Sequence, residues 1–185
     1  MSASQPRQDA QSIVFSSKGP IEGMKQSLAN RFMHSTIVLC YSLIDVMAWL
    51  SLPPEKTAVH RGDFIKWSEQ YVIPNGSFNC TAEDLYSARC SVLHTMTAES
   101  ELTREGRAVK IAYTWGNIPP LSPAQLQEGN IIGTMLHLDS LCSAIERGSK
   151  QFFANILTDN KQLDTVNSRA RKLFVQFETS VSKTH

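Results

Sequence analysis

The sequence predicts a mainly α-helical bundle of about five helices that carries a small β-hairpin insert. Two observations predict the helices: apolar residues recur at helical spacing over long stretches, and Pro-Pro or Asn-Gly pairs separate those stretches. A third observation, a short run in which apolar and polar residues alternate, predicts the insert. The 185 residues include 42% hydrophobic and 19% charged residues, ordinary values for one globular core. We expect a single domain over 20–178, with the insert near 107–137.

Both ends of the chain are expected to lie outside this domain. Residues 1–19 are rich in Ser and Gln and lack the apolar run of a signal peptide, which predicts a disordered polar tail. Residues 179–185 are expected to form a short C-terminal tail. The formal net charge of +1 gives no overall field for a nucleic acid or a membrane, so any polyanion site must be local. The four cysteines show no C-x-x-C pairing, which favours free thiols and a cytoplasmic protein.

The first helix is predicted from about 23 to 52. Its second half, 37–50, is apolar on all sides except for Ser42 and Asp45. Fourteen such residues are too few to cross a bilayer, so we expect a buried central helix and no membrane partner. Pro53 and Pro54 end this helix.

A second helix is expected from about residue 56 or 61 to residue 72, followed by a loop at 74–77. The third helix is predicted over 81–97, where Thr81 and Asp84 form a capping-box start. Arg89 falls within the apolar stripe of this helix, and a guanidinium is rarely buried without a partner. The stripe consists of Leu85, Tyr86, Ala88, Val92, Leu93 and Met96.

The pattern changes after the third helix. Apolar residues alternate over 109–115, which predicts a strand, and 130–137 is expected to pair back with it as the second strand of a hairpin. Ser122 and Pro123 are typical of the start of a short helical turn. Helical spacing resumes at Leu138 and continues to the C-terminal part of the chain. A last helix is expected to begin near Asp159, with these residues facing inwards: Leu163, Val166, Ala170, Leu173, Phe174 and Phe177.

Common catalytic and phosphate-binding motifs are absent from the sequence. There is no P-loop, dinucleotide-binding glycine pattern, nucleophile elbow or zinc-protease motif, and the five histidines lack ligand spacing. We therefore expect no metal site and no cofactor.

Asp45 and Arg89 are the remaining candidates, because each is a lone charge in an apolar stretch. Two opposite charges of this kind are expected to be neighbours, since either one alone is costly to bury. One interpretation is a structural ion pair that fixes how two helices align, with His94 a surface residue. On an ideal helix, Arg89 and His94 lie roughly 140° apart.

The segment from Arg89 to His94 resembles the R-x(4–6)-H motif of the HEPN superfamily. The setting is similar too: a helical core, an acidic residue (Asp45) in the first helix, and a final helix that packs back. The resemblance covers about 25–97 and 138–178. It implies a HEPN-like helical bundle and a homodimer in which the two motif helices meet. The residue after the motif Arg is typically Asn, Asp or His, whereas this chain has Cys90.

The resemblance also implies a metal-independent endoribonuclease of a toxin or defence system, with Arg89, His94 and Asp45 as its catalytic residues. His94 would move protons at the 2′-hydroxyl or the leaving oxygen, Arg89 would neutralise charge on the phosphate, and Asp45 would hold the guanidinium. Tyr86 is expected either to stack on an RNA base or to fill the core. The basic side of the last helix either guides an RNA backbone or is only solvated; it consists of Lys161, Arg169, Arg171 and Lys172.

Three functional hypotheses remain open at this point. The first is a HEPN-like RNA-binding protein with ribonuclease activity. The second is a catalytically inactive HEPN-like dimer that binds RNA, a nucleotide or a partner protein such as an antitoxin, which Cys90 makes credible. The third is a helical protein-interaction module in which Asp45 and Arg89 form a structural pair.

Overall fold

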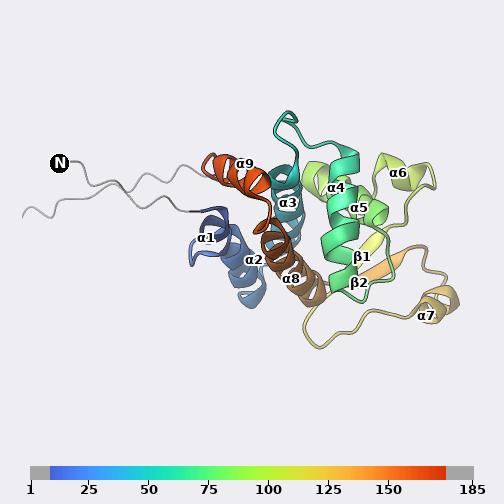
Figure 1. The fold of residues 1–185 in the computed structure, drawn as a ribbon. Coiled ribbons are helices and arrows are strands. Elements are labelled where there is room, and N and C mark those ends of the chain that lie inside the picture. Colours follow the sequence, from blue (N-terminus) through green and yellow to red (C-terminus); the bar gives the residue numbers. More distant parts are fainter. Residues whose placement is uncertain (1–8, 174–185) are drawn as a thin grey trace, which may run out of the picture.

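The computed structural model describes residues 9–173, a mainly helical fold with a small two-stranded sheet (Figure 1). The prediction of a helical bundle with a β insert is confirmed at this level. The first half contains α1 (Ala10–Phe15), α2 (Pro20–Ala29), α3 (Met33–Ser51), α4 (Arg61–Trp67), the π-helical turn η1 (Ser68–Val72), the 3-10 turn η2 (Ile73–Asn75) and α5 (Ala82–Thr95). The second half contains α6 (Glu101–Arg104), β1 (Ile111–Thr114), α7 (Pro123–Glu128), β2 (Thr134–His137), α8 (Leu138–Ile156) and α9 (Asn160–Ala170).

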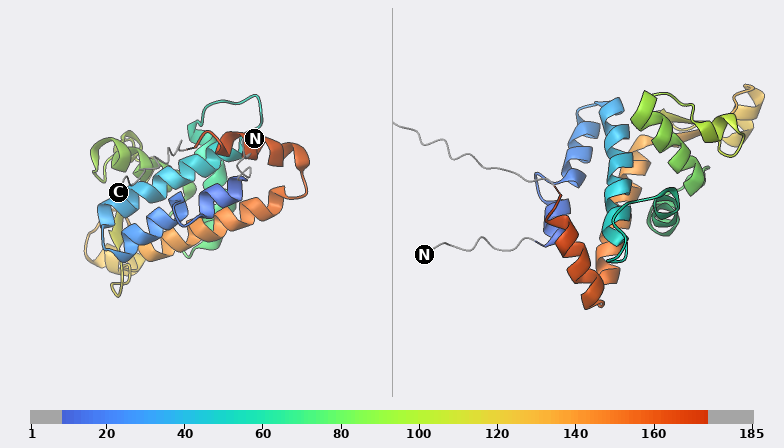
Figure 2. Two further views of the ribbon diagram at one scale, coloured as in Figure 1. Left: turned by 90° about the vertical axis from the view of Figure 1, so that its left-hand side faces the viewer. Right: turned by 90° about the horizontal axis from the view of Figure 1, so that it is seen from above.

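Helix α3 is the centre of the fold, with α2 and α9 on one side and α4 and α5 on the other (Figures 1 and 2). Its 19 residues are long and apolar enough to cross a membrane by length and composition. Half of that stretch is buried within the protein, however, and Cys40, Tyr41, Ile44 and Met47 are fully enclosed. Because so much of α3 is buried within the protein, we describe it as a core helix.

The predicted first helix over 23–52 is two helices, α2 and α3. The chain turns between them at Arg31, whose φ of 61° is left-handed. The side chain of Asn30 donates to the carbonyl of Gln26 and so caps the end of α2. After this corner α3 begins, and the two helices pack beside each other.

The prediction of a disordered tail over 1–19 is wrong for its second half. Helix α1 forms because Asp9 accepts a hydrogen bond from the backbone N–H of Ser12, and because Ala10 and Val14 are buried. The backbone N–H of Ala10 also donates to Asn167 of α9. The rest of that expected tail (1–8), the C-terminal tail, and Phe174 and Phe177 lie outside the described residues.

The second predicted helix is distorted where α8 crosses it. Helix α4 continues into η1 and η2, so the chain from 61 to 75 changes its winding twice. Helix α8 lies very close to this segment at Gly148, where an added Cβ would lie 2.1 Å from the carbonyl oxygen of Tyr71. Glycine is therefore required at this crossing.

The two strands of the insert are parallel, so the predicted hairpin is wrong. Ile111 is aligned with Thr134, and Thr114 with His137. The connection over 115–133 contains α7 and returns the chain to the starting end of β1, so both strands run in the same direction.

Several hydrogen bonds attach this insert to the bundle, and two of them involve α5 and α3. The capping box predicted at the start of α5 is present, with Asp84 Oδ2 accepting from the backbone N–H of Thr81. The other oxygen of Asp84 accepts from the backbone N–H of Val109, just before β1, at 2.8 Å. A second contact joins the insert to α3: the hydroxyls of Tyr41 on α3 and Tyr113 on β1 are 2.5 Å apart. The insert is thus fixed to both α5 and α3.

We expect Gly148→Ala to lower the free energy of unfolding by about 2–4 kcal/mol, because the new methyl group collides with backbone. Denaturant unfolding followed by circular dichroism measures this change. Gly23→Ala is the matched control: it is a helical glycine with no atom near its added Cβ, and we expect it to stabilise by about 0.4–1 kcal/mol. Equal effects of the two substitutions would contradict the close crossing.

Candidate functional site

Arg89 of α5 and Asp45 of α3 form the ion pair that the sequence predicts. The Nε of Arg89 donates to Asp45 Oδ2 at 2.9 Å, and one terminal nitrogen lies 2.9 Å from the same oxygen. Each residue comes from the apolar part of its helix, so the packing of α5 on α3 brings the two together. The prediction that they are neighbours is confirmed.

The pair is half-buried. The side chain of Arg89 is 25% exposed and that of Asp45 is 23% exposed. Burial raises the pKa of the Asp45 carboxyl, although the hydrogen bond and charge of Arg89 act in the opposite direction. Burial also disfavours the charge on Arg89, but Asp45 outweighs this and raises the pKa of the guanidinium. Part of Arg89 therefore remains accessible to an anion while Asp45 fixes its orientation.

His94 lies in the last turn of α5 and is exposed. Within residues 9–173 it makes no hydrogen bond or ion pair. The helix ends just after it, at Met96, whose φ of 51° is left-handed. His94 and Arg89 differ in setting, one fully at the surface and the other held against α3, so a single subunit does not direct both side chains at one point.

Tyr86 packs into the side of the bundle. Its ring meets that of Phe64 edge to face, with centroids 5.5 Å apart, and the guanidinium carbon of Arg61 lies 5.7 Å from its centroid. Burial raises the pKa of Tyr86, as does a hydrogen bond with Cys90, while Arg89 and Arg61 act to lower it. These contacts fit the expected role of Tyr86 in filling the core. Cys90 thus lies close to both the tyrosine and the motif arginine.

Sequence reasoning missed Arg61, a second guanidinium beside the motif. Arg61 opens α4 and donates to Glu83 in the first turn of α5. Arg107 lies on the same carboxylate at 3.9 Å. Arg61 is the first residue of α4, and nothing in the local sequence distinguishes it from an exposed arginine. It comes near Tyr86 only because α4 packs on α5.

Arg169 was expected on the basic outer side of α9, and this expectation is wrong. The residue is 7% exposed, and its guanidinium donates to the carbonyls of Trp49, Leu52, Pro53 and Lys56. It also lies over the ring of Trp49 at 5.8 Å. These carbonyls belong to the end of α3 and the turn that follows, where helical backbone acceptors lack partners. Arg169 therefore caps the central helix and is not available to RNA.

The sequence signal for this role is weak. Arg169 lies three residues after the buried Val166, at the edge of the apolar stripe of α9. Arg89, in contrast, falls inside the stripe of its helix. The burial of Arg169 therefore follows from the packing of α9 on the end of α3 and not from a clear pattern in the sequence.

The rest of the expected basic face is exposed but lies away from the motif. Lys161, Arg171 and Lys172 are all solvent-accessible. Helix α9, however, packs on the side of α3 opposite to α5 (Figures 1 and 2). In one subunit these side chains and Arg89 do not form a continuous surface.

Neither metal-binding groups nor known relatives add to this site. Across residues 9–173, no cluster of three or more His, Cys, Asp or Glu side chains is arranged to hold a metal ion. Comparisons with protein-family models, curated protein sequences and solved structures gave no match.

We expect Asp45→Ala to lower the free energy of unfolding by about 1–3 kcal/mol, less than the 3–5 kcal/mol of a fully buried pair, because Arg89 can turn to water. A double-mutant cycle with Arg89→Ala, measured by denaturant unfolding, should give a coupling energy of about 1 kcal/mol. Strictly additive single changes would contradict the pairing.

We expect Arg169→Lys to lower the free energy of unfolding by about 2–4 kcal/mol, since one ammonium cannot replace the planar set of donors. The exposed neighbour supplies the control: Arg171→Lys should change stability by less than about 0.5 kcal/mol. If both variants melt like the wild type, the capping role of Arg169 is wrong.

Proposed function

We propose that this chain is a HEPN-like RNA-binding protein that cleaves RNA without a metal ion when two copies associate through α5. The observation that carries the proposal is the Arg89 guanidinium, held by Asp45 through two nitrogens on one carboxylate oxygen and still a quarter exposed. An oriented, partly accessible guanidinium is suited to bind a phosphate. Its position five residues before the exposed His94 supports the HEPN-like interpretation of this helix.

A second copy is part of the proposal because of the geometry of α5. On one helix Arg89 and His94 point roughly 140° apart. A two-fold contact between two α5 helices places the His94 of each copy on the same side as the Arg89 of the other. The exposed end of the helix, with Met96 67% exposed, gives such a contact apolar surface.

The proposed reaction is the internal transesterification of RNA. The 2′-hydroxyl oxygen attacks the adjacent phosphorus, its proton passes to one His94, and the bond from phosphorus to the 5′-oxygen breaks. The leaving 5′-oxygen takes a proton from the second His94, so the products are a 2′,3′-cyclic phosphate and a 5′-hydroxyl. Arg89 stabilises the charge on the phosphoryl oxygens, and Asp45 positions Arg89. DNA lacks the attacking hydroxyl and is not a substrate.

Further basic groups extend the proposed RNA surface beyond the motif. Arg61 lies next to Tyr86 on the same side of the bundle as Arg89 and adds a cation for the RNA backbone. Lys161, Arg171 and Lys172 lie on or directly after α9, a helix on the far side of α3 from α5 (Figure 2), and would contact only a long RNA that wraps the protein. A defence or toxin role, with an antitoxin-like partner, belongs to the same proposal.

The second candidate function is a helical protein-interaction module, and one observation favours it. Asp45 and Arg89 are hydrogen-bonded to each other within the bundle, and Cys90 interacts with Tyr86. A pair of this kind aligns α3 with α5 without any ligand. In that case His94 is an ordinary surface residue.

Cleavage of a single-stranded RNA in EDTA by wild type and by His94→Ala separates the two candidates. We expect the variant to lose at least 100-fold in rate with an unchanged melting temperature, because general acid–base catalysis contributes about 10²–10⁴-fold. His34→Ala, another exposed histidine, is the matched control and should retain activity. The all-DNA version of the substrate should remain intact.

Sedimentation equilibrium of the full chain tests the dimer independently. A dimer whose cleavage activity falls on dilution in step with dissociation supports the proposal. A monomer that does not cleave or bind RNA supports the interaction module and removes the nuclease.

A further inference from the structure

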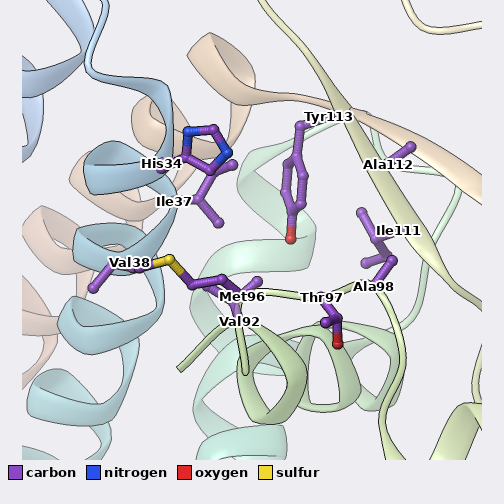
Figure 3. Close-up of a pocket in the computed structure, with 10 residues that line it drawn as sticks. All are labelled: His34, Ile37, Val38, Val92, Met96, Thr97, Ala98, Ile111, Ala112 and Tyr113. Atoms are coloured by element: carbon purple, nitrogen blue, oxygen red, sulfur yellow. The ribbon is translucent and has the colours of Figure 1, made fainter. Parts of the chain in front are cut away.

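A cavity of about 240 Å³ lies between the first half of α3, the end of α5 and β1 (Figure 3). Its inner wall is formed by the buried side chains of Ile37 and Ile111. Met96, Ala98 and His34 are exposed residues of its lining, so the cavity opens to solvent along them. An apolar cavity of about 150 Å³ is large enough for benzene, so this one holds a substituted single ring.

The lining contains three polar side chains: His34, Thr97 and Tyr113. His34 is exposed, and the hydroxyl of Thr97 is hydrogen-bonded to Thr95 and Glu99.

The hydroxyl of Tyr113 is the one that lies at the inner wall. Figure 3 shows this hydroxyl between Ile37 and Ile111 in the view of the cavity. Its partner is the hydroxyl of Tyr41, 2.5 Å away and fully buried behind it. Burial raises the pKa of both phenols, so both keep their protons at neutral pH.

Within the described part of the chain, the pair of tyrosine hydroxyls has one proton without a hydrogen-bond acceptor. Two hydroxyls carry two protons, and only one of them is used in the bond between the tyrosines. Among the described residues, neither hydroxyl has any other hydrogen bond. Tyr41 is enclosed, whereas Tyr113 lines the cavity, so the arrangement in which Tyr41 donates leaves the proton of Tyr113 facing the cavity. A hydrogen-bond acceptor there would satisfy it.

The lining also defines the charge and shape of the ligand. It includes no Asp, Glu, Lys or Arg, and the one imidazole, that of His34, is exposed at the open side, so a charged molecule in the inner part would lose its hydration without a counter-ion. The ring of Tyr113 and the thioether of Met96 both make favourable contacts with an aromatic ring. These features together favour an uncharged aromatic molecule with one acceptor oxygen.

We propose that this cavity is a binding site for a small, uncharged aromatic molecule whose carbonyl oxygen accepts a hydrogen bond from Tyr113. The lining of the cavity includes none of Arg89, His94 and Asp45, and it shares only Met96 with the dimer contact proposed above. The test below therefore measures ligand binding directly and does not depend on RNA cleavage.

Two compounds of the same shape test the site on the full-length protein: acetophenone, and α-methylstyrene, in which a methylene group replaces the carbonyl oxygen. Methyl resonances of Ile37, Ile111 and Met96, followed by NMR titration, report binding at the cavity. We expect saturable shifts with both compounds and about threefold to tenfold tighter binding of acetophenone, the range of one neutral hydrogen bond. Benzoate, which is charged, should bind more weakly than acetophenone.

Four variants separate the hydrogen bond from simple filling of the cavity. Tyr113→Phe should abolish the preference for acetophenone, whereas Tyr41→Phe should keep it. Ala98→Phe should fill the cavity and prevent binding of both compounds. Ala154→Phe, at an exposed position of α8 outside the cavity, should bind like wild type.

Several outcomes would overturn the proposal. These are wild-type protein with no saturable shift for either compound, tighter binding of benzoate, or unchanged binding in Ala98→Phe. Methyl shifts that change with protein concentration but not with compound concentration would also overturn it, because a second copy of the chain would then fill the cavity. Should Tyr113→Phe not fold, the wild-type preference and the pair Ala98→Phe and Ala154→Phe decide the question.

Discussion

The structure depends on satisfying the polar groups of a central helix that is otherwise apolar. Helix α3 has one carboxylate, Asp45, and a set of carbonyls at its C-terminal end, and the surrounding core offers few partners for them. Arg89 of α5 donates to the carboxylate of Asp45, and Arg169 of α9 donates to the carbonyls. The helices that carry these arginines, α5 and α9, lie on opposite sides of α3 (Figure 2), so these polar contacts help to fix the position of both.

Much of this could be predicted from local pattern and from misplaced charge. Thr81 and Asp84 predict the start of α5 because a capping box depends on neighbouring residues only. Asp45 and Arg89 are predicted to meet because each is a lone charge in an apolar stretch. The site, however, also depends on packing that local sequence patterns do not reveal. Arg61 gives no local signal, and Arg169 lies at the edge of the apolar stripe of α9, so it was assigned to the outer face.

The errors in the fold have a common cause, which is that strand direction and helix continuity are decided at a distance. Alternation finds both strands of the insert, but their direction depends on the long connection through α7, which returns the chain before β2 begins. Likewise, neither proline nor glycine marks the break between α2 and α3. The chain turns there at Arg31, which adopts a left-handed conformation. Helix α1 forms because α9 provides a contact for Ala10.

Asp84 has a mechanical consequence. One carboxylate group serves both the first turn of α5 and the backbone just before β1, through separate oxygens. Any binding partner that displaces the insert must therefore also release the start of α5, so the two segments cannot move separately. A force applied to the sheet would therefore act on the first turn of α5 through Asp84, and on the end of α5 through the walls of the cavity that it shares with β1.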